Sequence, residues 1–229
     1  MGVAISCPRC GGPVRPPDLM HSEWRCDTDG AVLPLHVAQH IGPEIADAAR
    51  TKLIAAAQRA GEQRPTPLWC PWPLPSGWTV TGLGWVGDER SGVRATALAC
   101  SGPGPVEHGP ADAVIIAEEP GIGLGTRFAG IPGTDPGTFF DGDLATMTAH
   151  AKVRAAGWPT PLWMAKSPED RTVYVGEAAG MWLYIVTWPA AAGYLLEEEL
   201  DLHDLCDDVP AQLVYGAPSP YLHGQAGQA

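Results

Sequence analysis

The sequence is short of basic residues, and this shortage excludes one common class of partner. Its 229 residues contain 14 lysines and arginines against 26 aspartates and glutamates, for a formal net charge of −12. Residues 1–67 carry seven side chains of each sign, whereas residues 68–229 carry seven basic and nineteen acidic ones. A nucleic-acid binder needs a basic stripe that displaces counterions from phosphates. Neither part of the chain has one, so we expect no nucleic-acid partner.

Dense, paired cysteines are also absent. The chain has six cysteines, of which Cys70, Cys100 and Cys206 stand singly. A secreted disulfide scaffold is a short chain in which cysteines are dense. The first thirty residues also lack an apolar stretch of signal-peptide length. We therefore expect reduced thiols and a cytoplasmic location.

Long apolar runs without interruption are absent as well. Residues 178–196 contain no charged side chain, but Pro189 and Gly193 interrupt the run and acidic residues flank it. A membrane-spanning helix is close to this length but normally has basic flanks on its cytoplasmic side. Two buried strands and a turn explain the run better, so we expect no membrane span.

Two short cysteine turns near the start of the chain are its most informative feature. Cys7 and Cys10 form the first turn, and after fifteen residues Cys26 opens the second, in which Asp29 stands where a fourth cysteine is usual. This spacing is typical of a zinc ribbon, in which each turn presents two side chains to one tetrahedral ion. The sequence therefore predicts a structural zinc ion bound by Cys7, Cys10, Cys26 and Asp29.

The identity of the fourth ligand stays open at this stage. Closed structural zinc sites prefer sulfur and nitrogen to oxygen, so His21 and His36 compete with Asp29. A water molecule in the fourth position is a further alternative, as in catalytic zinc sites. A degenerate ribbon that has lost its metal and kept its hairpin would show the same residues.

The remaining local patterns predict one helix and several antiparallel strands. Pro43 and Glu44 open a helical pattern that Gly61 ends. Residues 78–86 and 93–100 flank a turn-forming segment and predict a hairpin, as do residues 171–178 and 181–188. A compact apolar run at 113–117 predicts a buried strand.

We therefore predict an α+β fold with an N-terminal zinc ribbon, a short helix and a mostly antiparallel β domain. The predicted organisation is a zinc-ribbon-like domain at 1–35, a helix and linker at 36–66, an acidic, tryptophan-rich β domain at 67–222 and a flexible tail at 223–229.

Tryptophan is concentrated in the acidic part of the chain, where eight of the nine occur. Tryptophan usually packs in cores, but it is also enriched at binding hot spots. We predict an aromatic binding surface that includes Trp69, Trp72, Trp78 and Trp163. The expected function is a non-enzymatic module that binds a protein partner or a small ligand, and the sequence does not determine its oligomeric state.

An enzyme acting on a small substrate is the alternative. Cys100 with His108 offers a nucleophile and a base, and Glu118 offers a carboxylate before a glycine-rich loop at Gly121–Gly125. The loop fits neither the NTPase nor the dinucleotide pattern. Because no spacing fixes these groups together, we assign no catalytic residue.

The chain resembles a family of uncharacterised actinobacterial proteins over nearly its whole length. That family has a zinc-ribbon-like CPxCGG segment and a Pro/Trp-rich β domain of unknown function, and the resemblance implies no established activity. Its pattern carries His or Cys at the fourth ligand position, from which Asp29 departs. The matching strings are Cys7-Pro8-x-Cys10-Gly11-Gly12, Trp24-x-Cys26-Asp27, Pro71-Trp72-Pro73-Leu74-Pro75-x-Gly77-Trp78, Arg94-Ala95-Thr96-Ala97-x-Ala99-Cys100-Ser101-Gly102-Pro103 and Ala117-Glu118-Glu119 through Gly121-x-Gly123-Leu124-Gly125.

Overall fold

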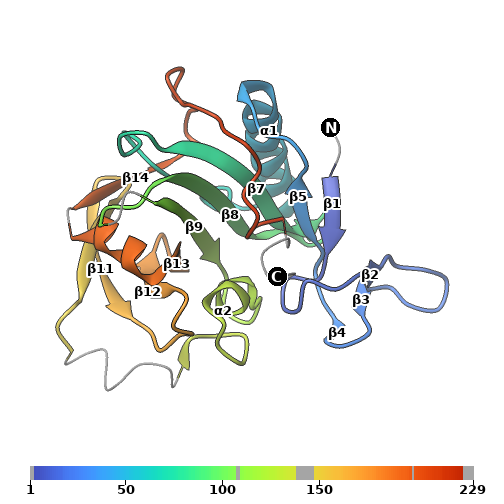
Figure 1. Cartoon of the computed structure of the whole chain (residues 1–229). Helices are drawn as coiled ribbons and strands as arrows, with labels where there is room; N and C mark the ends of the chain where they lie inside the picture. Colours follow the sequence, from blue (N-terminus) through green and yellow to red (C-terminus); the bar gives the residue numbers. More distant parts are fainter. Residues whose placement is uncertain (1–2, 107–108, 138–146, 198, 224–229) are drawn as a thin grey trace.

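The structure is a computed structural model that describes residues 3–106, 109–137, 147–197 and 199–223. It consists mostly of sheet, with few helices (Figure 1). The elements are β1 (Val3–Ser6), β2 (Val14–Arg15), β3 (Arg25–Cys26), β4 (Gly30–Ala31), β5 (Leu35–Ala38), α1 (Pro43–Ala60), β6 (Trp69–Pro71), β7 (Thr79–Asp88), β8 (Gly92–Pro103), β9 (Pro110–Glu118), α2 (Leu124–Ala129), β10 (Ala151–Ala155), β11 (Trp158–Met164), β12 (Thr172–Ala178), β13 (Met181–Trp188), the 3-10 helix η2 (Ala190–Leu196) and β14 (Leu200–Asp204).

One large sheet of eleven strands dominates the fold. Its order is β1-β5-β7-β8-β9-β13-β12-β11-β10-β14-β6. The named strand pairs in the described ranges are antiparallel, except β10 with β14, which is parallel. The edge strand β6 contacts β8 and β9 in the middle of the same sheet. The sheet is therefore curled, and it encloses part of the core.

Both predicted hairpins and the predicted helix are present. β7 pairs with β8, and β12 pairs with β13. The helix α1 begins with Pro43, and Gly61 ends it in the left-handed conformation with φ 72°. This φ is one that glycine adopts without steric cost, which explains the sharp end of the helix.

The large sheet buries apolar side chains on both of its faces. Leu183 and Ile185 pack on the enclosed face together with Leu53 of α1. Tyr184 and Val186 pack on the other face, where α2 contributes Phe128. A strand that is apolar on both sides is expected in the middle of a sheet covered on both faces.

The cysteine turns lie beside one end of this sheet. A small sheet in the order β2-β3-β4 holds the turns, while β1 pairs with β5 and β5 pairs with β7 of the large sheet. Figure 1 shows the small sheet next to α2. The N-terminal segment is thus joined to the large sheet by hydrogen bonds, and the domain boundary at residue 35 stays a prediction.

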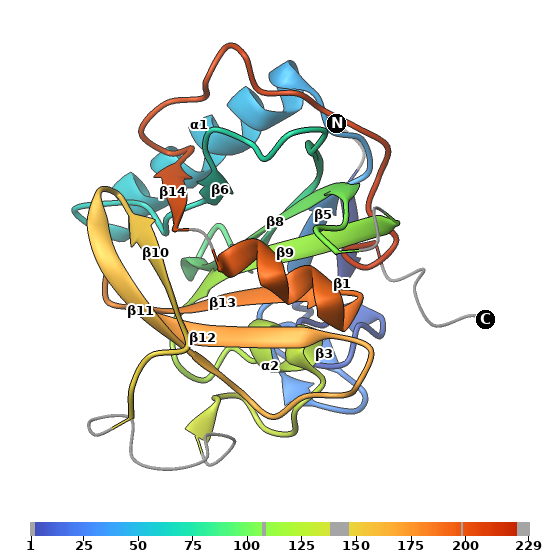
Figure 2. The same ribbon diagram turned by 60° about the vertical axis from the view of Figure 1, so that its left-hand side comes forward.

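Residues 178–196, the apolar run, form the end of β12, the strand β13 and the helix η2. Figure 2 shows η2 lying along β12 and β13, which it contacts. Within the described ranges, no helix is long and apolar enough to cross a membrane. Residues 224–229 of the predicted tail lie outside the described residues.

Candidate metal centre

The first cysteine turn is closed by its own backbone. The N–H of Cys7 donates to the carbonyl of Gly12 at 2.8 Å, and the N–H of Gly11 donates to the carbonyl of Cys7 at 2.9 Å. Gly11 has φ 76°, a conformation that favours glycine. The turn therefore folds back sharply behind Cys10, and both thiols face the second turn.

The second turn is a tight connection between β3 and β4. Cys26 of β3 is paired with Gly30 of β4, and Gly30 has φ 72°. Asp29 precedes this glycine, so its carboxylate is returned toward Cys26. The two turns converge because Val14 of β2 pairs with Cys26.

The four side chains predicted to bind metal come together in the structure. Oδ2 of Asp29 lies 3.2 Å from Sγ of Cys7 and 3.5 Å from Sγ of Cys26, and the Sγ atoms of Cys10 and Cys26 are 3.4 Å apart. All four potential ligand atoms lie within 4.8 Å of one another. Tetrahedral sulfur ligands about 2.3 Å from a zinc ion are separated by about 3.8 Å. The observed spacing and the donor set therefore fit one tetrahedral metal ion.

The two competing histidines lie elsewhere. Nε2 of His36 is 3.0 Å from the carbonyl oxygen of Gly87, and its ring stacks on Trp85 at a centroid distance of 5.4 Å. Nδ1 of His21 lies 3.4 Å from Asp18 on the surface. Neither belongs to the metal-ligand group found in the described residues. Asp29 is thus the side chain positioned as the fourth donor.

The surroundings shift the pKa values of the three thiols in different directions. Burial, together with the neighbouring Asp29 carboxylate, raises the pKa of Cys7 to about 12. Burial and then Asp29 raise the pKa of Cys10 in the same direction. Burial also acts to raise the pKa of Cys26, but the backbone N–H groups of Asp29 and Thr28 lower it overall. Hydrogen bonds from the thiols, that of Cys10 first, lower the pKa of Asp29.

Metal binding at this site is expected to strengthen with rising pH. A metal ion binds thiolates, so it must displace the protons that the raised pKa values of Cys7 and Cys10 retain. Each displaced proton makes the apparent affinity about tenfold higher per pH unit. Competition titrations of zinc between roughly pH 6 and pH 8 measure how steeply the apparent affinity rises with pH. A flat profile would contradict thiolate ligation.

Two arginines join the first cysteine turn to the loop after β9 and to α2. Arg9 donates from Nε to the carbonyl of Ile122 at 3.2 Å and from Nη2 to that of Gly121 at 2.9 Å. Arg127 of α2 donates to the carbonyl of Cys7 at 3.4 Å. Both positive charges act on the ligand group, Arg9 on Asp29 and Arg127 on the thiols of the first turn. They would offset the net negative charge of three thiolates and a carboxylate around a divalent ion.

Sequence reasoning missed these two arginines. Arg9 lies inside the first cysteine turn, and a residue in that position must point away from the metal, which is a local signal. Arg127 lies 120 residues from Cys7 and offers no such signal.

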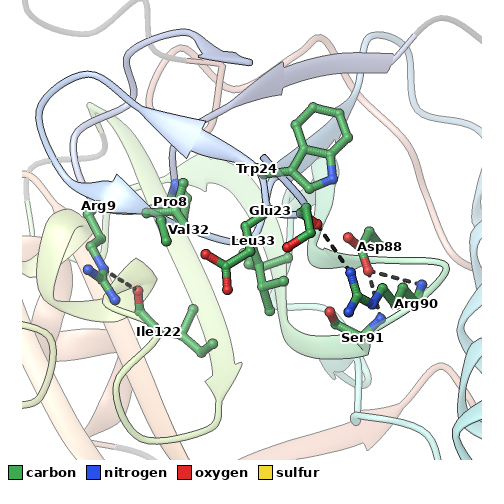
Figure 3. Close-up of a pocket in the computed structure, with 13 residues that line it drawn as sticks. Pro8, Arg9, Glu23, Trp24, Val32, Leu33, Asp88, Arg90, Ser91 and Ile122 are labelled. Atoms are coloured by element: carbon green, nitrogen blue, oxygen red, sulfur yellow. Dashed lines mark hydrogen bonds between the residues drawn. The ribbon is translucent and has the colours of Figure 1, made fainter. Parts of the chain in front are cut away.

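A groove of about 360 Å³ separates the cysteine turns from the sheet. Figure 3 shows Arg9 and Ile122 at one end and Arg90 at the other, with Glu23 and Trp24 between them. Nη1 of Arg90 donates to the carbonyl of Ser22 at 3.2 Å and ties the connection between β2 and β3 to the turn between β7 and β8. The groove thus has one wall that depends on the cysteine turns and one that belongs to the large sheet.

The four tryptophans predicted to bind a partner have different environments. Trp69 and Trp78 are 3% and 5% exposed and pack in the enclosed core. Trp163 is half-buried, with its indole N–H donating to the carbonyl of Met147 at 3.2 Å. Trp72 is half-buried beside the acidic strand β14 and lines a second groove. Burial keeps Trp69 and Trp78 away from the surface, whereas Trp72 lines a groove.

Two described residues of the enzyme alternative, Cys100 and Glu118, lie on opposite faces of the sheet. Cys100 is fully buried on the enclosed face of the sheet, where the neighbouring Cys70 and then burial raise its pKa well above the usual value. Glu118 follows Val114 and Ile116 on the opposite face, because side chains alternate along β9. His108 lies outside the described residues.

The glycine-rich loop uses its backbone donors internally. Oε2 of Glu118 accepts hydrogen bonds from the N–H groups of Leu124 at 2.8 Å and Gly125 at 3.1 Å, and Asp135 accepts from that of Gly121 at 2.9 Å. A phosphate group needs such N–H groups to be free. Carboxylates already occupy these three, so the loop is not arranged to bind phosphate.

Comparisons with known proteins identify a family for the chain but no activity. Neither a curated protein nor a solved structure matches it. One family model matches residues 1–222, and its description states that the function is unknown. The actinobacterial origin implied by the resemblance stays a prediction. Because the family model covers residues 1–222, the chain belongs to the family of unknown function DUF6758.

Proposed function

We propose that this chain is a non-enzymatic, zinc-stabilised binding module of the cytoplasm. The observation that carries the proposal is the convergence of Cys7, Cys10, Cys26 and Asp29 within 4.8 Å. In this proposal residues 1–35 form a zinc ribbon and residues 67–222 form the domain that meets a protein partner or a small ligand.

A structural role for the zinc ion is favoured over a catalytic one. Four protein side chains would complete the tetrahedral coordination of the ion and leave no coordination position for water or substrate. Cys7 is fully buried and Cys26 is 5% exposed, whereas Cys10 lies at the surface. A catalytic ion would need an open coordination position in a cleft, whereas the groove in Figure 3 is lined by Pro8 and Arg9 rather than by the ligands.

The zinc ion would act on binding through the groove beside it. It would fix the turn that carries Arg9, and with it one wall of the groove between the cysteine turns and the sheet. The site needs reduced thiols, and all six cysteines are free. Reduced thiols are the normal state in the cytoplasm, which supports that location.

Metal analysis of two aspartate variants tests this proposal. The wild-type chain is expected to hold one zinc ion. Asp29→Asn is expected to weaken zinc binding by more than the roughly 10- to 100-fold that is typical when a residue supporting a metal ligand is replaced. Asp27→Asn is the matched control, because Asp27 lies in the same turn but pairs with Arg15 on the surface. Zinc content by mass spectrometry and competition titration measure the difference.

The outcomes separate the alternatives. A wild-type chain purified without zinc, and unable to take it up, would overturn the proposal. Equal affinities in Asp29→Asn and wild type would remove Asp29 as a ligand and leave a site of three cysteines. Asp29→Cys, which restores the usual ribbon set, is expected to bind zinc at least as tightly as the wild type.

A further inference from the structure

A second groove lies on the acidic side of the large sheet, away from the cysteine turns. Its volume is about 730 Å³. Four segments build it: the chain after β6, the connection between β8 and β9, the helix η2 and the start of β14. The lining residues include no member of the N-terminal segment 3–38.

The floor of this groove is apolar and aromatic. Trp72, Leu74, Leu195 and Leu200 are partly buried and pack against the enclosed core. At the rim, Tyr194 is 56% exposed. Proline rings at 73, 75 and 105 add rigid apolar surface. Exposed aromatic faces held on a fixed backbone lose little entropy when a ligand covers them.

The charge of the groove has one sign. Glu197, Glu199 and Asp201 line it with exposed carboxylates, and none of its described lining residues is basic. Arg154 of β10 lies outside the groove. Its Nε atom is 3.1 Å from Oε1 of Glu199 and 4.0 Å from Oδ1 of Asp201. Three carboxylates against one guanidinium leave the rim net negative.

We propose that this groove binds a lysine- or arginine-bearing peptide segment of a partner protein. Cations are attracted to the faces of tryptophan and tyrosine, and carboxylates at the rim pair with the same side chains. An extended peptide, whose side chains alternate, can place basic groups near Glu197 and Asp201 while its apolar parts cover Trp72. The inference rests on the proposed function as a binding module, to which it adds a peptide-binding surface that is separate from the groove beside the cysteine turns.

A peptide fits the groove better than a free small cation. The groove draws on four separate chain segments, and the exposed residues Tyr194 and Val106, 56% and 55% exposed, leave it open along the rim. A small cation in an open groove would keep most of its water and gain little, whereas a peptide brings apolar contacts along the floor.

Fluorescence anisotropy with labelled peptides tests the inference on the full chain. The probes are a short lysine- and proline-containing peptide and the same peptide with glutamate in place of lysine. The basic peptide is expected to bind, with an affinity that falls as salt is added, and the acidic peptide is expected not to bind. Arginine amide serves as the small-cation competitor, and it is expected to compete only weakly.

Two sets of charge variants locate the binding surface. The triple variant Glu197→Gln, Glu199→Gln, Asp201→Asn is expected to weaken peptide binding roughly tenfold and to flatten its salt dependence. The control variant Asp47→Asn, Glu169→Gln, Glu177→Gln removes the same charge from exposed sites elsewhere and is expected to bind like the wild type. Tyr194→Ala, at an exposed site, is expected to cost about two- to fivefold.

Several results would overturn the inference. They are failure of the basic peptide to bind, equal losses in the two triple variants, and arginine amide matching the peptide in affinity. The zinc proposal is tested separately with Cys7→Ser, which is expected to lose metal and keep its affinity for the peptide, because the groove contains no residue of the cysteine turns. A chain that holds zinc but binds no basic peptide therefore refutes this inference alone.

Discussion

Removal of the metal is expected to unfold the cysteine turns locally and to leave the large sheet folded. The turns have little apolar packing of their own, because their apolar cluster consists of Cys7, Cys26 and Val32, with Val14 against it. The strands β2, β3 and β4 have two residues each. So small a unit depends on its metal, because zinc binding supplies its folding free energy.

Hydrogen exchange with and without a chelator measures this effect. Amide protons in residues 7–33 are expected to exchange at least roughly hundredfold faster after chelation, while those of β7, β8 and β13 keep their protection. A chelator saturated with zinc beforehand is the control for direct effects of the reagent. Unchanged exchange in residues 7–33 would contradict a structural metal, and equal loss of protection throughout the sheet would contradict local unfolding.

The features that the sequence predicted are those encoded by neighbouring residues. The hairpins at β7–β8 and β12–β13 follow from alternation and a glycine-containing turn, and α1 follows from Pro43 and Gly61. The ligand group follows from spacing within two turns. Each of these signals lies within a short stretch of chain, so a single sequence contains it in full.

The features that the sequence did not predict depend on pairings between distant segments. β6 pairs with β14, more than a hundred residues later, and this pairing curls the sheet. Arg127 contacts Cys7 across a similar separation in the sequence. Neither contact has a periodicity or spacing that a local pattern could detect.

The positions of single tryptophans also depend on contacts between distant segments, which the sequence does not reveal. Trp69 and Trp72 are three positions apart in one proline-rich stretch, yet Trp69 is buried under the curled sheet and Trp72 lines the acidic groove. The difference arises because β6 ends at Pro71 and the chain then leaves the sheet. Composition identifies an aromatic segment, and only tertiary structure separates its core residues from its surface residues.

Glu118 is a buried carboxyl whose ionisation the fold opposes. It is fully buried, and Oε1 has no hydrogen-bond partner within the described part of the chain. The hydrogen bonds from the N–H groups of Gly125 and Leu124 stabilise its charged form only in part. Burial therefore dominates and raises the pKa of Glu118 from 4.5 to about 7.

The raised pKa of Glu118 predicts that its contribution to stability falls as pH rises. The folded state holds the proton up to about pH 7, whereas the unfolded state releases it near pH 4.5. Between these values the folded state binds more protons, so the free energy of unfolding falls across this window, by about 3 kcal/mol in total. Above about pH 7 both states are ionised, and the contribution no longer changes.

Glu118→Gln is expected to remove this pH dependence. The amide oxygen of glutamine can still accept the hydrogen bonds of Leu124 and Gly125, but the side chain does not ionise. The stability of the variant relative to wild type should therefore increase by about 3 kcal/mol between pH 4 and pH 8, as measured by urea unfolding. Other titrating groups act equally in both proteins and cancel in this difference. Parallel stability curves for wild type and Glu118→Gln would show instead that folding does not raise the pKa of Glu118, because the N–H groups that open α2 balance its charge.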